Sequence, residues 1–553
     1  MTSKAHDEYD DLGDGRRRRW RWIAILVGAA AVVAALVAVL SSGGSGSKAS
    51  ARPLVVNVAV APSNLDPAIT CDFNEVGYVN NALYATLVSY GSKPGPSGTR
   101  QADATKIVPY LAKSWTVSPD GRTYTFTLRT DAKFPSGRPM DAAAVKYSFE
   151  RALAMNGCGG GTLLDNYFTP ALITGIDTPS SDTVVIHLRH QDPHFLRVLP
   201  QPGGGIVDKG VVDLHGGVKK NSVNEWMAGH SAGGGPYLLA QYQPGTQMVL
   251  KANPRFFGTP PASREIILKF ISSDPTLLLN ARSGQADATI GLSLPSVHQI
   301  ASDKNLSIVA TQSPTAEMVR FSDKAAPFNN VSVRKALALA IPYSSILSRI
   351  AYGYGQLFSG PLPPGFPYAD PSVEAPIQTD LAQARQLIKQ SGVKTPISFT
   401  VTVAEGDAVA ESIATTLQSV WASIGVNIKI QKLAISDFST QKYANRLQAF
   451  IDADGPFLVD SGYFLRYDMV CGGDYNLQQM CVPEADRLLE VSGHTPDAEA
   501  QPIWNRLIDA WNQDWPRINL YGPKQVVVLG PHFDVGSYTY NAELDMRTWK
   551  AKG

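Results

Sequence analysis

The stretch that decides the fold runs from Val108 to Arg151 and reads VPYLAKSWTVSPDGRTYTFTLRTDAKFPSGRPMDAAAVKYSFER. Within it, Pro119-Asp120-Gly121 has the composition of a tight turn, because proline presets one backbone angle and glycine tolerates left-handed backbone. The following residues, Thr123 to Leu128, alternate hydroxyl-bearing and apolar side chains. Alternation with a period of two predicts a strand that has one buried face.

A helix is predicted to follow this strand. Asp141 belongs to the residue types that cap helix N-termini, and apolar residues recur at every fourth position in Val145, Phe149 and Leu153. This spacing places one apolar stripe against a core. The charged residues expected on the exposed side of the helix are Lys146, Glu150 and Arg151.

The same stretch contains a series of short motifs. They are P-x-L-A-x-S-W at Pro109 to Trp115, D-G-x-x-Y-T-F-x-L-R at Asp120 to Arg129, F-x-x-G-x-P at Phe134 to Pro139, and a helix end at Lys146 to Arg151. The series resembles the block that recurs in family 5 of the substrate-binding proteins of ABC importers, the oligopeptide, dipeptide and nickel-binding group.

Further segments resemble the same family and occur in the same order along the chain. They are Ala82 to Val88, Gly234 to Tyr237, Asn253 to Gly258, Asn280 to Asp287, Pro327 to Leu337 and Asp380 to Gly392. No single motif is decisive, but six or more in the family's order favour membership over chance.

The resemblance implies an α/β protein with the two-lobed, type II periplasmic-binding-protein fold and an additional domain. It places lobe I at about 53–90, 196–310 and 520–553, the additional domain at about 91–195, and lobe II at about 311–519. The residues independently predict alternating strands and helices. The expected strands are Leu54 to Val60, Ile266 to Ile271, Ser398 to Val403 and Asn427 to Leu433, and one expected helix is Ala408 to Ile424.

The function that the resemblance implies is a receptor outside the cytoplasm that closes on a solute, most simply a peptide, and delivers it to an ABC permease. Nickel complexes and oligosaccharides are alternative solutes, and an anchored sensor, chaperone or scaffold is the alternative role. No enzyme activity and no cofactor are expected, since metalloprotease, nucleophile-elbow and Walker motifs are lacking. A formal net charge of +1 argues against nucleic acid as a partner. The receptor is expected to be monomeric.

The N-terminus is predicted to anchor the protein in a membrane. Residues 1–22 are polar and end in an arginine cluster, residues 23–40 are uncharged and apolar, and residues 41–52 form a Gly/Ser-rich linker. At 1.5 Å per residue the apolar run spans about 27 Å, close to the hydrocarbon core of a bilayer. The arginines keep 1–22 in the cytoplasm and send 53–553 outside. Cleavage after Ala51, which would secrete the protein, is the alternative.

Four cysteines lie on the exported side, where disulfides persist. Three pairings are possible. Cys471 and Cys481 enclose a short polar loop, so their pairing is geometrically easy, and Cys71 with Cys158 would then follow. No metal site is expected. His187, His190 and His194 resemble a cluster but are interpreted as surface histidines, because residues three apart on a strand face opposite sides.

The expected ligand site follows from the resemblance to family members that bind peptides. In these proteins an aspartate late in the chain neutralises the ammonium group of the ligand, and Asp452 takes that position here, with Asp454 as a close substitute. The alternative is that Asp452 caps a loop or pairs with an arginine. Further candidates are Arg320 for a ligand carboxylate and, for the cleft wall, the aromatic residues Tyr463, Trp226, Phe321 and Tyr84.

Two departures from the family pattern indicate that the ligand preference of this protein can differ from that of other family members. Ile341-Pro342-Tyr343 replaces an acidic-basic pair, and Pro135-Ser136 replaces polar residues of the turn.

Overall fold

The computed structural model describes residues 52–70, 79–162, 172–192, 194–370, 372, 378–455, 460–473, 476–495, 497–537, 539–540 and 545–552. The chain divides after Arg52, and everything below concerns the unit Pro53–Gly553. The predicted segments 1–22 and 23–40, most of the linker, and Cys71 lie outside the described residues. Within the described ranges, no helix has the length and apolar character needed to cross a bilayer.

Lobe I is built on parallel strands. β1 (Leu54–Val58) pairs in parallel with β10 (Glu265–Phe270) on one side and with β11 (Ala288–Ile290) on the other. β9 (Gln247–Ala252) and β8 (Tyr237–Gln243) extend the sheet by antiparallel pairing. β1 reads LVVNV, and Leu54, Val56 and Val58 on one face and Asn57 on the other are at most 1% exposed, as expected for a strand covered on both faces.

Lobe II is also an α/β layer. β15 (Ile397–Ala404) pairs in parallel with β16 (Val426–Leu433) and with β17 (Ala449–Asp454), and β17 pairs antiparallel with β13 (Ala316–Phe321). The helices that share its hydrophobic core are α8 (Val331–Leu339), α9 (Tyr343–Arg349), α10 (Leu381–Gln390) and α11 (Ala408–Ala422). Trp421 is fully buried at the centre of this core.

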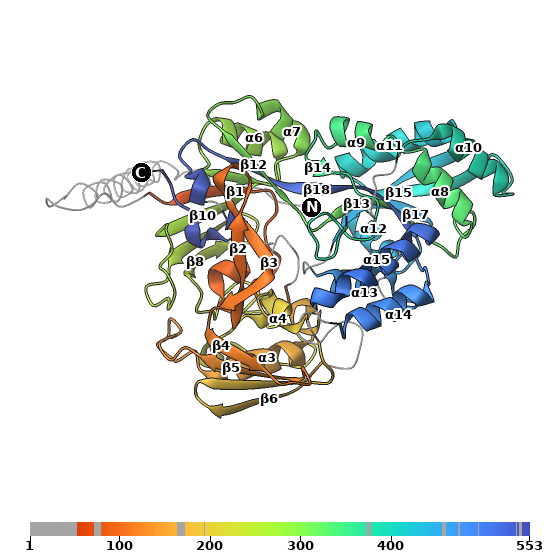
Figure 1. Ribbon diagram of the computed structural model, residues 1–553. Coiled ribbons are helices and arrows are strands. Elements are labelled where there is room, and N and C mark those ends of the chain that lie inside the picture. The colour runs from red at the N-terminus through yellow and green to blue at the C-terminus, as the bar shows by residue number, and fades with distance from the viewer. Residues whose placement is uncertain are drawn as a thin grey trace, which may run out of the picture. The chain divides into compact units, whose positions relative to one another are not determined.

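One long strand joins the two lobes. β18 (Arg517–Leu529) pairs with β11 and β12 (Ser307–Gln312) through its second half, and with β13 through its first half. β14 (Gly355–Gln356) also pairs with it. Figure 1 shows β18 running from the strands of lobe I to those of lobe II. The chain therefore crosses between the lobes twice, between β12 and β13 and within β18, and these crossings are where a hinge would bend.

The quoted stretch folds as a separate small layer. β4 (Ala112–Val117), β5 (Thr123–Leu128), β7 (Thr183–Leu188) and β6 (Ile173–Ser180) form a four-stranded sheet in the order β4-β5-β7-β6. α3 (Ala142–Met155) packs against it. The predicted strand has its predicted bounds, and the Asp141 side chain accepts a hydrogen bond from the Ala144 amide, which confirms the cap.

The expectation that Arg151 lies on the exposed side of this helix is wrong. Its side chain is 1% exposed and forms an ion pair with Asp66, which is fully buried. Arg151 Nη1 donates to Asp66 Oδ1 over 2.9 Å, so the guanidinium ties α3 to the loop that follows β1. A charged residue is buried only when paired, and the partner here is 85 residues away in sequence.

The remaining elements complete the lobes. A second small sheet has the order β19 (Thr539–Tyr540), β3 (Arg100–Pro109) and β2 (Val88–Pro94). The other helices are α4 (Phe195–Val198), α5 (Lys209–Leu214), α6 (Asp274–Arg282), α7 (Leu294–Ile300), α12 (Ile435–Tyr443), α13 (Ser461–Met469), α14 (Pro483–Ser492) and α15 (Asp497–Asp514). Three of them, α13, α14 and α15, lie between β17 and β18 in the sequence and share one hydrophobic cluster with Leu362 and Phe366.

Candidate functional site

The carboxyl ends of the parallel strands mark the edge at which a ligand is expected. In open α/β sheets, ligands bind outside these ends. In lobe II, β15 ends at Ala404 and the neighbouring β17 ends at Asp454. Gly455 follows, and a Cβ on it would lie 2.6 Å from the Pro314 carbonyl oxygen in the segment that crosses between the lobes. The edge of the sheet thus meets the crossing segment at the end of β17.

A cluster of charged side chains occupies this edge. The carboxylate of Asp452 accepts from Arg320 Nε over 3.2 Å and from Lys442 Nζ over 3.0 Å. Asp454 accepts from Arg320 Nη2 over 2.8 Å, and Arg320 Nη1 donates to Gln478 Oε1 over 2.9 Å. Asp452, Asp454 and Arg320, predicted from the sequence as separate ligand contacts, therefore contact one another.

The two aspartates differ in what they can offer a solute. Both carboxylate oxygens of Asp452 are bonded to cations of the chain itself, which matches the alternative that this residue pairs with an arginine. Burial raises the pKa of Asp452, but Lys442 and Arg320 outweigh burial and hold it below its usual value. The side chain of Asp452 is 8% exposed and that of Asp454 is 18% exposed. Asp454 is therefore the carboxylate that a cationic group can reach more easily.

Arg517 adds positive charge beside this cluster and was missed in the sequence. It lies opposite Arg320 in the β13–β18 register and is 2% exposed. Its Nε donates to Asn519 Oδ1 over 3.0 Å, and its guanidinium lies 4.8 Å from the centre of the Trp511 ring. Burial and the charge of Arg320 lower the pKa of Arg517. The signal was an arginine at the start of a strand that reads RINLY over its first five residues and is buried throughout them.

The aromatic candidates do not gather at one place. Phe321 is fully buried in the core of lobe II, with its ring centre 4.6 Å from that of Phe328. Trp226, in lobe I, is half-buried and lies between the rings of His215 and His230. Tyr463 lies on α13, and its side chain is outside what the structure describes.

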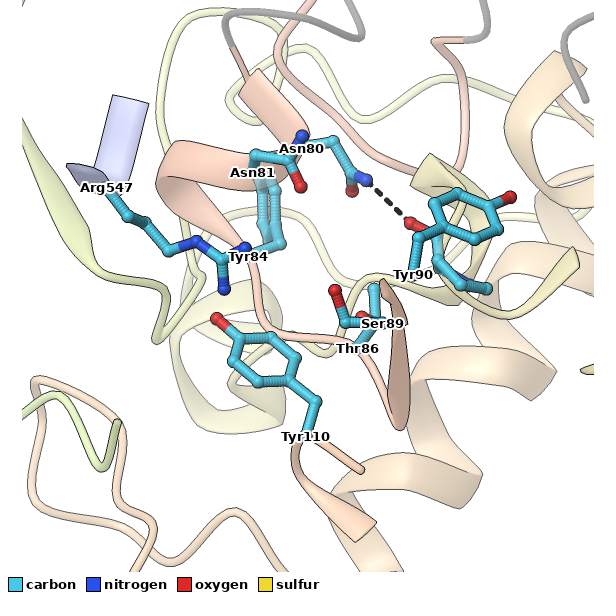
Figure 2. Close-up of a pocket in the computed structure, with 9 residues that line it drawn as sticks. Asn80, Asn81, Tyr84, Thr86, Ser89, Tyr90, Tyr110 and Arg547 are labelled. Atoms are coloured by element: carbon cyan, nitrogen blue, oxygen red, sulfur yellow. Dashed lines mark hydrogen bonds between the residues drawn. The ribbon is translucent and has the colours of Figure 1, made fainter. Parts of the chain in front are cut away.

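Tyr84 lines a polar pocket on lobe I. Its side chain is 2% exposed and its hydroxyl donates to the Leu65 carbonyl over 2.9 Å. The pocket is small and partly enclosed, with room for about one water molecule. Figure 2 shows the residues around it, with the bond from Asn80 to the Pro200 carbonyl. Its lining consists of Asn80, Asn81, Tyr84, Thr86, Ser89, Tyr90, Tyr110, Pro200 and Arg547, so no described residue of lobe II contributes to it.

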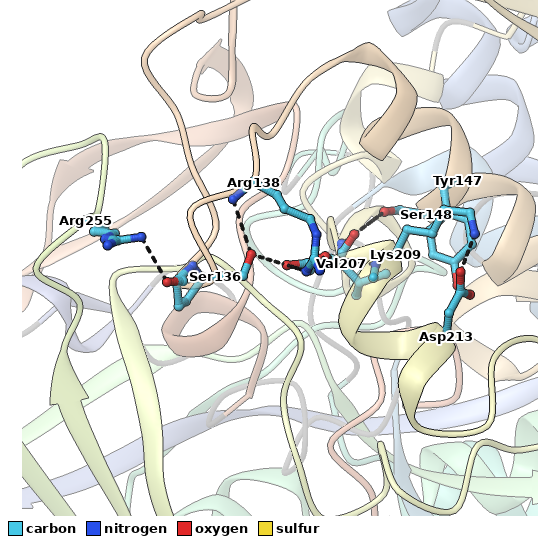
Figure 3. Close-up of polar contacts among 11 residues, drawn as sticks. Ser136, Arg138, Tyr147, Ser148, Val207, Lys209, Asp213 and Arg255 are labelled. Carbon is cyan, nitrogen blue, oxygen red and sulfur yellow. Dashed lines mark hydrogen bonds and ion pairs between the residues drawn. The ribbon is translucent and has the colours of Figure 1, made fainter.

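A second polar network joins the small layer to lobe I (Figure 3). The Ser136 hydroxyl donates to Asp208, Arg138 Nη1 donates to the same carboxylate over 3.1 Å, and Arg255 Nη1 donates to the Pro135 carbonyl over 3.1 Å. Asp208 also caps α5 through the Gly210 amide. The departure at Pro135-Ser136 from the family pattern therefore serves attachment of this turn, away from the charged edge of lobe II.

One contact bridges the two lobes directly. Asp460, which precedes α13 of lobe II, has its Oδ2 2.5 Å from His194 Nδ1 and 2.9 Å from Arg197 Nη1 of α4. In Figure 1, α4 and α13 face each other. The interpretation of His194 as a surface histidine is wrong, since its side chain is only 13% exposed. Its partner is more than 260 residues away, and no local pattern in the sequence indicates such a pair.

The cysteines and possible metal ligands are simple to place. Cys471 and Cys481 form a disulfide with Cα atoms 4.5 Å apart, as the short loop between them predicts. Cys158 is disulfide-bonded as well, and its expected partner Cys71 lies outside the described residues. In the ranges that the structure covers, no group of three His, Cys, Asp or Glu side chains could hold a metal ion.

Comparisons with known proteins agree with the geometry. Residues 106–476, more than half of the chain, match the model of the bacterial extracellular solute-binding proteins, family 5. The chain is 28% identical to the probable D,D-dipeptide-binding periplasmic protein DdpA of Escherichia coli, over 75% of this chain and 77% of that one. It is 27% identical to the nickel-binding periplasmic protein of the same organism, over 64% and 67% of the two chains.

A solved structure shares the fold. The periplasmic binding protein DppA of Helicobacter pylori, associated with an ABC transporter and solved with the peptide STSA, superposes with a TM-score of 0.75 at 22% identity, over 90% of this chain and 98% of that one. The two-lobed periplasmic-binding-protein fold expected from the sequence is thereby confirmed. The chain belongs to the bacterial extracellular solute-binding proteins of family 5, and it is a solute-binding receptor outside the cytoplasm and not an enzyme.

Proposed function

We propose that this receptor captures a peptide, or a small solute with a peptide-like ammonium group, at the carboxyl edge of lobe II and delivers it to an ABC permease. The observation that carries the proposal is the partly exposed carboxylate of Asp454 at the end of β17, beside the segment that crosses to lobe I. Relatives named for dipeptide binding and a structural neighbour bound to a peptide support the solute class.

Asp454 is the proposed anchor in preference to Asp452. A carboxylate that is already paired with two cations gains little from a third, whereas Asp454 shares one guanidinium with its neighbour and retains exposed surface. A charge-assisted hydrogen bond from a ligand ammonium contributes about 1.5–3 kcal/mol. Asp452 then acts indirectly, because it holds Arg320 and Lys442 in place beneath the site.

The test is calorimetry with the peptide that gives the strongest signal from a set of di- to pentapeptides. We expect Asp454→Asn to weaken binding about tenfold or more, because the substitution keeps the shape and removes the charge. N-acetylation of the peptide should weaken binding to the unaltered protein by a similar factor and have little additional effect in the variant. Ser412→Ala, on the exposed face of α11, is the control.

Two results would count against this anchor. If Asp454→Asn binds the free and the acetylated peptide as the unaltered protein does, the ammonium group is held elsewhere. If no peptide of the set binds at all, the solute belongs to another chemical class.

We further propose that the receptor stays attached to the membrane through residues 23–40. The apolar length of this segment, the arginines before it, and the distance of Ala51 from its end support an uncleaved anchor. Intact mass of the native protein decides between the two forms. A mature chain that begins at Arg52 would replace the anchor by a secretory signal.

A further inference from the structure

The contact between α4 and α13 has the properties of a closure device. We propose that His194, Arg197 and Asp460 form an ionic latch that stabilises the closed arrangement of the two lobes without touching the solute. The three residues are positioning residues, since they set how often the cleft is closed and not which solute it accepts. The latch depends on the proposed function in one respect: closure of the lobes serves to retain the solute.

The lobe I side of the latch is held by neighbouring hydrogen bonds. The Tyr90 hydroxyl donates to the Arg197 carbonyl over 2.7 Å, and Gln201 Nε2 donates to the Tyr90 hydroxyl over 2.7 Å. Asn80 Nδ2 donates to the Pro200 carbonyl over 2.9 Å, just beyond α4. Tyr90, Asn80 and Pro200 also line the polar pocket of lobe I, so the backbone of α4 is fixed to the wall of that pocket.

The lobe II side is equally well defined. Asp460 is fully buried, and its carbonyl accepts from the Phe464 amide over 3.0 Å in the first turn of α13. The Ser461 hydroxyl donates to the Pro367 carbonyl. A Cβ at Gly462 would lie 2.9 Å from His194 Nε2, so the absence of a side chain at this position allows α13 to approach the histidine.

Opening the lobes would change the surroundings of all three side chains at once. In the structure the buried Asp460 carboxylate lies 2.5 Å from His194 Nδ1 and 2.9 Å from Arg197 Nη1, and we take this arrangement as the closed one. In an open arrangement each group would be hydrated separately. Pairing in the dry contact is opposed by the loss of hydration, so the net preference for closure is moderate and adjustable. A moderate preference suits a receptor that must also release its solute.

The histidine makes the latch sensitive to pH. The groups that face it are Asp460, Asp192 and Arg197. Burial lowers the pKa of His194, but the Asp460 carboxylate outweighs burial and raises it above its usual value. Closure therefore favours the protonated ring. This contribution is fully present below the ordinary pKa of histidine, about 6.5, and it is lost as the pH rises through the raised value.

The experiment measures closure of the full-length chain in detergent without any solute. Dyes for single-molecule energy transfer are attached through unnatural amino acids at Leu279 on α6 and Ile435 on α12, which are 65% and 66% exposed, so the disulfides stay intact. The ratio of closed to open molecules is recorded between pH 5.5 and 9. Because no solute is added, the result is independent of whether the solute is a peptide.

We expect the closed-to-open ratio of the unaltered protein to fall as the pH rises. Asp460→Asn should lower the ratio about tenfold at pH 6 and remove its pH dependence. His194→Gln should also remove the pH dependence, while Arg197→Lys, which keeps the charge, should retain most of the closure. His190→Gln, at a partly exposed histidine of the same segment, is the matched control and should behave as the unaltered protein.

The latch is overturned if Asp460→Asn and His194→Gln both leave the ratio and its pH dependence unchanged. It is also overturned if His190→Gln removes the pH dependence as completely as His194→Gln does. Circular dichroism of each variant checks folding. If Asp460→Asn does not fold, the comparison between His194→Gln and His190→Gln decides the question alone.

Discussion

At the scale of single residues, the chain concentrates buried charge on the β13–β17–β18 face of lobe II. Arg320 is 1% exposed and serves two carboxylates and one amide. Replacing this arginine by an uncharged residue leaves Asp452 and Asp454 with one cation fewer in a dry environment. The charges of this cluster therefore contribute to the stability of the fold as well as to the proposed binding.

We expect Arg320→Gln to lower the free energy of unfolding by about 3–5 kcal/mol, the scale for breaking a buried ion pair. The pKa of Asp452 lies below its usual value in the folded state, so the cluster stabilises the fold above the ordinary aspartate range and loses this effect as the pH falls through the lowered pKa. Urea unfolding from pH 3 to 7 measures both the loss of stability in the variant and the pH dependence of stability. The control is Arg446→Gln, which is exposed, and equal midpoints for the two variants would contradict the assignment.

Glu317 carries a buried carboxyl group on the face of β13 opposite to that of Arg320. It is 4% exposed and lies opposite Tyr521 in the strand register, and the carboxylates of Asp407 and Asp452 lie near enough to affect its charge. Burial first, and then these two carboxylates, raise the pKa of Glu317 well above its usual value. Burial and the neighbouring carboxylates therefore favour the protonated, neutral form of this carboxyl group in the folded protein.

A raised carboxyl pKa costs stability as the pH rises, because the unfolded chain releases the proton above about pH 4.3 while the folded chain retains it. We expect Glu317→Gln, which cannot ionise, to lose less stability than the unaltered protein between pH 5 and 8. Thermal unfolding across this range tests the expectation. Parallel curves for the two proteins would show that Glu317 is ionised in the folded state.

At the scale of elements, the disulfide between Cys471 and Cys481 closes the connection from α13 to α14. We expect the double change Cys471→Ser and Cys481→Ser to lower the free energy of unfolding by about 2–4 kcal/mol, mainly because the unfolded chain gains freedom. Denaturant unfolding followed by tryptophan fluorescence is the measurement, since Trp504 and Trp511 belong to the same cluster. An unchanged midpoint would mean that the loop is ordered without the bond.

Several elements were predictable because their signals are local. The predicted strand at 123–128 is β5, the strand predicted at 427–433 is β16 (Val426–Leu433), and the helix predicted at 408–424 is α11 (Ala408–Ala422). Period-two and period-four patterns carry this information within a few residues. The acidic pair at the end of β17 was also found, through its resemblance to a family motif.

The ion-pair partners of the buried charged residues were not predictable, because these partners lie far away along the chain. Arg151 reaches Asp66, His194 reaches Asp460, and Arg320 is placed beside Asp452 by the β13–β17 register. In each case the sequence shows a charged residue of an ordinarily exposed type, and only the fold brings its counterion near. The resemblance placed Asp452 at the anchoring position and Asp454 as its substitute, and the proposal reverses this order because the sequence does not show which of the two side chains is more exposed.

At the scale of the whole folded unit, the two crossings between the lobes determine what the receptor can do. The lobes are connected by the β12–β13 segment and by β18, and the contact of Arg197 with Asp460 also spans them. A solute that contacts both lobes favours the closed arrangement by as much as its affinity for the two arrangements differs. Capture of the solute and closure of the lobes are then thermodynamically coupled.

The most direct test of this account is small-angle X-ray scattering of residues 53–553 with and without the solute that co-purifies with the native protein, identified by mass spectrometry. The unit is suitable because it has its own hydrophobic cores and is distinct from residues 1–52. A closing receptor predicts that the radius of gyration falls when the solute saturates the protein. An unchanged radius at saturation would contradict the central claim that the two lobes close on their ligand.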